Sequence, residues 1–154
     1  MTLVRVNKDN LDEYEEFIKK HPKGLFQHSS KWAKVKSAWK FEAIMLKNDS
    51  GEIKGSAAVL IRSIPIIKNS LMYCCRGFVC DENDFDTFDK LFNGLIELGK
   101  EYKAYCIKID PEIVIQNEAY KKHLIESGFI ELNPGCMDFE NVQPRFVYCF
   151  DYND

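Results

Sequence analysis

A carboxylate follows the most clearly patterned strand in the sequence. The run from Lys103 to Ile109 is rich in small, β-branched and aromatic residues, which favours a buried strand inside a sheet. Pro111 cannot donate a ladder hydrogen bond and biases Asp110 toward an extended backbone, so the carboxylate is expected at the strand exit. Ligands of open α/β sheets bind at that end of the strands. The alternative is that Asp110 only caps the following segment.

Two cations stand in settings that suit a phosphate. Lys36 follows Trp32 by four residues and precedes Trp39 by three, so a lysine is held beside two tryptophans. Such a lysine could neutralise a phosphate while a ring supports a flat group, although a solvated lysine beside a core seam is the commoner case. Arg76 precedes Gly77 at the head of a loop that follows a predicted strand.

Length and composition describe an ordinary globular chain. The 154 residues suffice for one domain with its own core, and the net charge of -3 does not suggest a nucleic-acid-binding protein, although a local basic patch remains compatible with it. The N-terminus has no apolar signal segment, and no apolar run approaches the roughly 18 residues that span a membrane. We therefore expect a cytoplasmic protein with no stable membrane insertion.

The cysteines do not form a recognisable framework. The six thiols include no Cys-x-x-Cys pair and no histidine at ligand spacing, so reduced and mostly packed cysteines are expected, with no metal site. The sequence also lacks a dinucleotide-binding glycine motif, a Walker motif, a zinc-protease motif and a nucleophile elbow. No cofactor is expected.

Hydrophobic periodicity and turn residues predict the order β-α-α-β-β-β-α-β-α-β-β. A short helix beginning at Ser29 or Ser30 should carry Trp32, Val35 and Trp39 on one face. This order indicates an α+β fold, an α/β sandwich in which helices flank a mixed central sheet, and it is the order of the GNAT-like acyltransferase fold. The remaining elements are expected at 3–6, 11–20, 41–47, 53–64, 70–75, 84–102, 104–110, 117–127, 129–132 and 146–150.

Four separated segments, in this order along the chain, form one pattern. The segments are Phe26-Gln27 with Trp32 to Lys36 and Trp39, Arg76-Gly77-x-Val79-x-Asp81, Ala104 with Ile107 to Glu112, and Gln143-Pro144-Arg145. Together they resemble the Fem (FemABX) family of non-ribosomal peptidyltransferases. The family attaches amino acids to peptidoglycan precursors in cell-wall synthesis, and its members consist of two GNAT-like domains. Residues 1–154 resemble the first of these as a single domain.

The resemblance implies a role for each matched residue. Lys36 is similar to the lysine that meets the diphosphate of a UDP-linked or lipid-linked muramyl pentapeptide. Asp110 is similar to the carboxylate proposed to deprotonate the acceptor amine, while substrate or water could carry the proton instead. Aminoacyl-tRNA is expected mainly at a second domain. The other positions implied to bind substrate are Trp39, Arg76, Tyr105, Gln143 and Arg145.

Two other functions are compatible with the same fold. A coenzyme A-dependent N-acetyltransferase would need a pyrophosphate-binding turn before a helix, but Arg76 to Asp81 lacks its second small residue and ends in an acid. A non-catalytic module that only binds the precursor is the third possibility. Phe78 stands where the family pattern has proline, which bears on the rigidity of that loop.

Overall fold

The fold is built on a twisted mixed sheet. In the computed structural model, which describes residues 1–66, 68–114 and 116–132, five strands pair in chain order. Neighbours from β1 to β4 are antiparallel, whereas β4 and β5 are parallel. The strands are β1 (Thr2–Arg5), β2 (Lys40–Lys47), β3 (Ile53–Ile64), β4 (Asn69–Cys74) and β5 (Ala104–Ile109).

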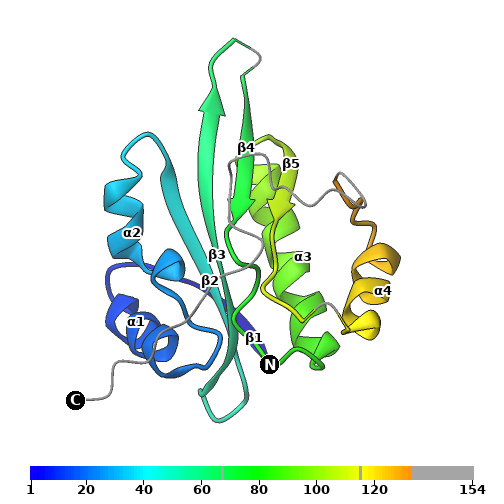
Figure 1. The fold of residues 1–154 in the computed structure, drawn as a ribbon. Coiled ribbons are helices and arrows are strands. Elements are labelled where there is room, and N and C mark those ends of the chain that lie inside the picture. Colours follow the sequence, from blue (N-terminus) through cyan, green and yellow to red (C-terminus); the bar gives the residue numbers. More distant parts are fainter. Residues whose placement is uncertain (67, 115, 133–154) are drawn as a thin grey trace, which may run out of the picture.

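Helices cover both faces of this sheet (Figure 1). One face carries α1 (Leu11–Lys20), the 3-10 turn η1 (Phe26–His28) and α2 (Ser30–Val35), and the other carries α3 (Phe85–Glu101) and α4 (Glu118–Glu126). Side chains alternate between the faces along a strand. Met45 of β2 therefore joins the core under α1, while its neighbours Ile44 and Leu46 join the core under α3.

Helix α3 closely matches the helix predicted at 84–102. The Asp84 carboxylate accepts a hydrogen bond from the Thr87 N–H at 3.0 Å and so caps the helix. Phe88, Leu91 and Leu95 are fully buried against the sheet. Gly55 of β3 permits this close packing, because a Cβ there would lie 2.7 Å from the Thr87 methyl carbon. The register of β3 with β2 shifts beside this glycine.

The predicted interior position of β5 is wrong for the described residues. Within them β5 pairs only with β4 and is the outermost strand, so Tyr105 and Cys106 are exposed. The strand predicted at 129–132 does not form. Phe129 packs on the core under α3, but Ile130 is 86% exposed and pairs with no strand of the described chain. The strand predicted at 146–150 lies outside the described residues.

The predicted state of the cysteines is confirmed as far as the structure reaches. Cys74, Cys75 and Cys80 are buried, Cys106 is exposed, and no disulfide joins these four. The other two cysteines lie outside the described residues. Among the described helices, none combines the length and the apolar character that crossing a membrane requires.

Candidate functional site

The Asp110 carboxylate lies where the parallel strands β4 and β5 end side by side. Tyr73 of β4 donates a hydrogen bond from its hydroxyl to Asp110 Oδ2 at 3.0 Å. The backbone N–H of Arg76 donates to Asp110 Oδ1 at 2.8 Å. Each carboxylate oxygen is thus held by one donor, and the carboxylate sits at the strand exit as the sequence predicted.

Burial dominates the electrostatics of this carboxylate. Withdrawal from water raises the pKa of Asp110, and the hydrogen bonds from Arg76 and Tyr73 only partly oppose that effect. No ion pair joins Asp110 to a cation within the described residues. A carboxylate with a raised pKa is a stronger proton acceptor than an ordinary surface aspartate.

A tight turn locks the Arg76 loop onto the segment after Asp110. Arg76 and Gly77 both adopt left-handed backbone angles, with φ of 60° and 78°, and the Gly77 N–H donates to the Cys74 carbonyl at 3.3 Å. A Cβ on Gly77 would stand 3.0 Å from Pro111 Cα, so close approach as well as φ requires glycine. Two segments matched to the Fem pattern therefore meet here.

Phe78, at the position where proline was expected, does not leave this loop loose. Its side chain is 5% exposed, and the centroid of its ring lies 4.7 Å from the centroid of the Phe88 ring on α3. The backbone of Val79 is hydrogen-bonded in both directions to Ser56 of β3. Packing of the Phe78 ring and backbone hydrogen bonding of Val79 therefore fix this loop, as a proline ring would otherwise do.

The side chain of Arg76 has unused donor capacity. Its Nε is buried and has no hydrogen-bond partner in the part of the chain that the structure describes. A buried donor without a partner is costly, and a guanidinium offers a fork that suits a phosphate or carboxylate. The position is thus suited to an anionic ligand next to Asp110.

Lys36 flanks an aromatic ring as predicted, but the helix is shorter than expected. Lys36 Nζ lies 5.0 Å from the centroid of the Trp32 ring. Helix α2 ends at Val35, which is 69% exposed, so the predicted shared face of the two tryptophans and Val35 is wrong. Trp39 lies in the turn before β2, with the Arg62 guanidinium 5.7 Å from the centroid of its ring.

The charges of Lys36, Arg76 and Asp110 all act on one buried thiol. Burial raises the pKa of Cys75, and the charge of Asp110 raises it further, whereas Arg76 and Lys36 lower it. A backbone hydrogen bond joins Arg76 to Asp110, but no hydrogen bond or ion pair links Lys36 to either of them among the described residues. The structure therefore brings Arg76 to the predicted base, whereas the convergence of Lys36 with this pair stays a prediction.

Of the remaining predicted site residues that the structure describes, Trp39 and Tyr105, neither has a recorded contact with Asp110. Tyr105 is 54% exposed at a shift in the β4–β5 register and has no recorded contact with Asp110 in the described structure. Gln143 and Arg145 lie outside the described residues. Sequence reasoning missed Tyr73, because its link to Asp110 depends on the pairing that sets Tyr73 opposite Lys108.

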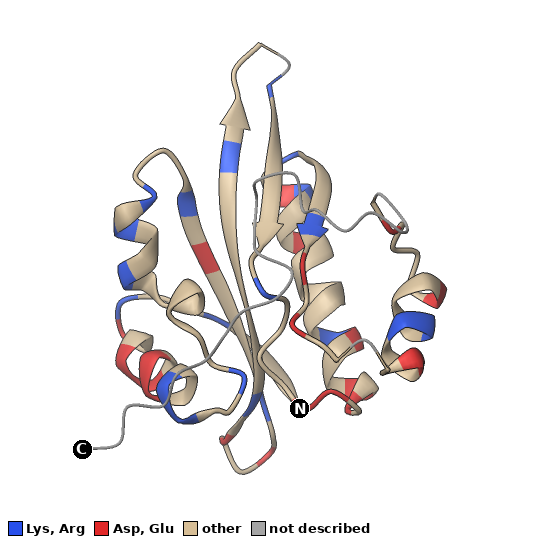
Figure 2. Cartoon of the chain, in the orientation of Figure 1, with Lys and Arg blue, Asp and Glu red and all other residues tan. Residues whose placement is uncertain are grey.

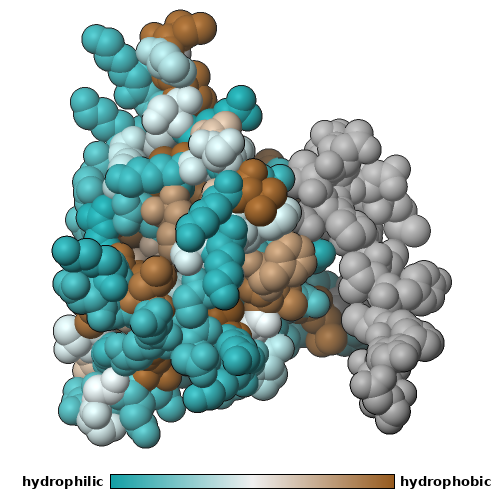
Figure 3. All heavy atoms as spheres, turned by 90° about the vertical axis from the view of Figure 1, so that its left-hand side faces the viewer, coloured by the Kyte–Doolittle hydropathy of each residue, from teal (hydrophilic) through white to brown (hydrophobic). Residues whose placement is uncertain are grey.

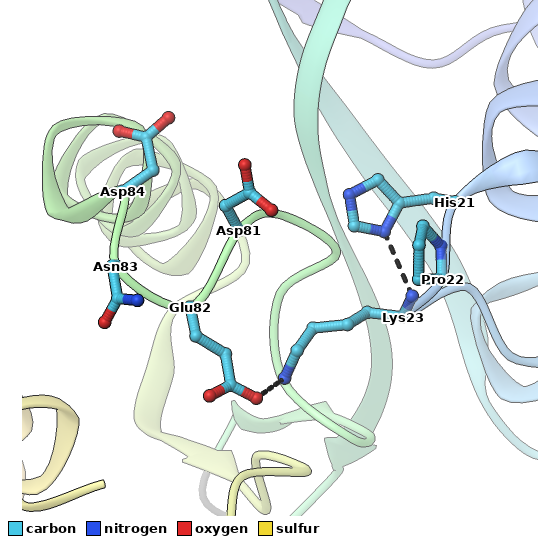
Figure 4. Close-up of a pocket in the computed structure, with 7 residues that line it drawn as sticks. All are labelled: His21, Pro22, Lys23, Asp81, Glu82, Asn83 and Asp84. Carbon is cyan, nitrogen blue, oxygen red and sulfur yellow. Dashed lines mark hydrogen bonds and ion pairs between the residues drawn. The ribbon is translucent and has the colours of Figure 1, made fainter.

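A hollow at the start of α3, apart from the Asp110 site, is acidic (Figure 4). Lys23 forms an ion pair with Glu82 at 2.5 Å and donates to the Glu112 carbonyl at 2.6 Å, so its charge is already engaged. Asp81 and Asp84 also line this hollow, and Asp84 caps α3. Acids at a helix start repel a phosphate. No group of side chains able to hold a metal occurs among the described residues.

Comparison with known proteins identifies relatives of one family. The FemAB family profile matches residues 10–133. The lipid II:glycine glycyltransferase of Staphylococcus epidermidis strain RP62A is 36% identical over 120 residues, which cover 76% of this chain and 29% of that protein. The enzyme of the same description from Staphylococcus aureus strain RF122 is 36% identical over 67% of this chain and 25% of its own length. The chain thus spans less than a third of these relatives.

Solved structures support the same grouping. A crystal structure of FemX matches with a TM-score of 0.73 and 30% identity, covering 83% of this chain and 32% of the other. A probable acetyltransferase matches with a TM-score of 0.64 at 14% identity over 100% of this chain and 99% of the other, which shows the fold alone. The predicted α+β GNAT-like fold is confirmed, and the chain belongs to the FemAB family.

Proposed function

We propose that residues 1–154 form the first GNAT-like domain of a cytoplasmic aminoacyltransferase that extends the peptide of a peptidoglycan precursor. The observation that carries this proposal is the Asp110 carboxylate, partly buried and held by Tyr73 and Arg76, in a member of the FemAB family. The relatives named lipid II:glycine glycyltransferase support a precursor of the muramyl pentapeptide class, linked to lipid or to UDP.

In the proposed reaction Asp110 accepts a proton from the acceptor amine of the precursor peptide. The freed nitrogen lone pair attacks the ester carbonyl of an aminoacyl donor, an amide bond forms, and the ester C–O bond breaks to release the donor's alcohol. The raised pKa of Asp110 favours this proton transfer. We assign the donor, an aminoacyl-tRNA, mainly to a second domain, which is consistent with the small share of the relatives that this chain covers.

The cations of the cluster fit the precursor's phosphates. Lys36 is exposed beside Trp32, and Arg76 retains a buried donor without a partner. Arg76 is hydrogen-bonded to Asp110 through its backbone, and the charge of Lys36 acts on the adjacent Cys75, so we infer that one ligand reaches all three. We assign Lys36 and Arg76 to the diphosphate and retain Trp39, Tyr105, Gln143 and Arg145 as predicted contacts to the rest of the precursor.

Replacement of Lys36 tests the binding half of the proposal. Lys36→Ala removes a charge-assisted contact worth roughly 1.5–3 kcal/mol, so we expect about ten- to hundredfold weaker binding of UDP-muramyl pentapeptide by calorimetry. The loss should shrink at high salt. Lys31→Ala on the same helix is the matched control, because it removes the same charge from an exposed position. Equal affinities of wild type and Lys36→Ala would contradict the assigned site.

Coenzyme A is the ligand that separates this proposal from an acetyltransferase. Its pyrophosphate would meet Asp81 and Asp84 at the start of α3, and the Asp84 side chain already accepts the hydrogen bond of the Thr87 N–H there. We expect no saturable binding of coenzyme A at micromolar concentrations. Calorimetric titration of the chain is the measurement, and saturable binding would favour the acetyltransferase.

A further inference from the structure

The charges of this acidic protein are unevenly distributed along its sequence. Residues 17–41 contain seven lysines and no acid, and residues 53–80 contain two lysines, two arginines and no acid. All 24 acidic residues lie elsewhere, although the net charge of the whole chain is only -3. Two strongly basic stretches are thus embedded in a chain that is otherwise acidic.

The fold brings parts of these two stretches to the same end of the molecule. Lys40, at the start of β2, pairs with Ile61 of β3, and the Arg62 guanidinium lies over the Trp39 ring. Figure 2 shows basic residues on α2, on the start of β2 and on the hairpin of β3 and β4. This hairpin projects beyond the rest of the molecule (Figure 1).

We use the term basic end for six residues of α2, the turn after it and the hairpin. Its four cations form no ion pair with any described residue, unlike the neighbouring Lys40, which pairs with Glu42. Its two aliphatic residues are unusually exposed, Ile66 at 94% and Val35 at 69%. Hydrophobic and hydrophilic surface lie side by side there (Figure 3). The six residues are Lys34, Val35, Lys36, Arg62, Ile66 and Lys68.

We propose that the basic end docks on the surface of an anionic lipid bilayer. Each cation near such a surface strengthens binding to it, and exposed aliphatic side chains gain by entering the headgroup region. Tryptophans such as Trp32 and Trp39, half-buried beside cations, are typical of membrane interfaces. RNA would also attract the cations, but it offers no apolar phase for Ile66, which favours the bilayer.

This docking extends the proposed function, on which the following consequence rests. Lys36 belongs to the basic end and is also the lysine assigned above to the diphosphate of the precursor. Contact of this end with a bilayer would bring Lys36 to the depth of lipid phosphates. The lipid-linked form of the precursor, with its diphosphate at the membrane surface, is therefore the form that this geometry favours over the UDP-linked form.

Vesicle co-sedimentation of the whole chain tests the proposal without any precursor. Vesicles of phosphatidylcholine with phosphatidylglycerol should bind the protein, and phosphatidylcholine alone should bind it much less. Arg62→Glu with Lys68→Glu should weaken binding at least about tenfold, and Ile66→Ser about threefold. The control, Lys121→Glu with Lys122→Glu on α4, has the same net charge and should change binding less than about twofold.

Several outcomes would overturn the docking proposal. One is equal binding to both vesicle types, and another is an equal loss in the α4 control. A third is binding of a single-stranded RNA oligonucleotide that depends on Arg62 and Lys68 while vesicles are ignored. Thermal unfolding of each variant shows that it is folded. Because no precursor is present, failure here leaves the Lys36 titration unaffected, and failure of that titration leaves vesicle binding unaffected.

Discussion

Two carboxylates, Glu42 and Asp110, each accept hydrogen bonds from an arginine and a tyrosine, but their pKa values are shifted in opposite directions. Glu42 on β2 accepts hydrogen bonds from Arg5 Nε at 2.8 Å and from the Tyr102 hydroxyl at 2.5 Å, and Lys40 lies 3.1 Å away. Burial alone would raise the pKa of Glu42, but these partners outweigh it and lower the pKa to about 2. Glu42 is therefore a fully compensated structural anion.

Asp110 also has a tyrosine and an arginine beside it, yet its pKa is raised. The difference lies in which part of the arginine makes the contact. Arg5 donates to Glu42 from its guanidinium, whereas the hydrogen bond from Arg76 to Asp110 comes from the backbone, and the charge of Arg76 lowers the pKa of Asp110 less than burial raises it. A neutral dipole offsets burial less than a cation does. The types of the neighbouring residues therefore do not distinguish a structural carboxylate from one that can accept a proton. The number of cationic groups that contact the carboxylate does distinguish them.

The largest expected effect is on the turnover number, which should depend on Asp110. Asp110→Asn removes the proposed base while preserving shape, so the rate of aminoacyl transfer by the complete enzyme should fall by about 10²- to 10⁴-fold. The KM for the precursor should change little, because Asn keeps an acceptor for Tyr73. Steady-state kinetics measure both parameters. A higher KM with unchanged kcat would show instead that Asp110 only positions the substrate.

The free energy of unfolding should depend more on Glu42 than on Asp110, the reverse of the order expected for turnover. Glu42→Gln leaves Arg5 and Lys40 without their anion and should lower the free energy of unfolding by about 2–3 kcal/mol. Asp110→Asn should change it by less than about 1 kcal/mol, because the loss of one hydrogen bond is offset by relief of a buried charge. Urea denaturation at neutral pH compares the two variants. Equal destabilisation would remove the proposed distinction.

Glu42 and Asp110 should also change the free energy of unfolding with pH in opposite directions. The folded-state pKa of Glu42 lies below its ordinary value of 4.5, so its contribution is present above pH 4.5 and is lost as pH falls toward 2. The raised pKa of Asp110 acts in the opposite direction, since its ionisation disfavours the native state as pH rises past its ordinary value. Glu42→Gln should therefore flatten the acid limb of the denaturation profile, and Asp110→Asn should not.

Much of the fold was predictable because local patterns agreed with tertiary packing. The helix predicted at 84–102 is present as α3, with Phe88, Leu91 and Leu95 buried against the sheet, and the proline after Asp110 correctly set the end of β5. The resemblance to the Fem family added the pairing of distant segments, which periodicity alone does not give. The Arg76 loop and the residues after Asp110 do lie together.

The errors occurred where tertiary context decides. An apolar run does not reveal whether a second strand lies beside it, so neither the outer position of β5 nor the absence of a strand at 129–132 was visible. Spacing alone also placed Trp39 on a helix that ends four residues earlier. Tyr73 escaped notice because a tyrosine within a strand reads as packing until its neighbour across the sheet is known.

The smallest expected effect tests Tyr73 as a positioning residue for Asp110. Tyr73→Phe removes one hydrogen bond to the charged carboxylate, worth about 1.5 kcal/mol, so the pKa of Asp110 should rise further by about one pH unit. Titration of the carboxyl carbon by NMR measures this change in the chain itself, independently of catalysis. Tyr105→Phe is the matched control, because that exposed tyrosine has no recorded contact with Asp110. An unchanged pKa in Tyr73→Phe would mean that the hydroxyl of Tyr73 does not tune the carboxylate, whereas an upward shift would make Tyr73 a residue that adjusts the proposed base.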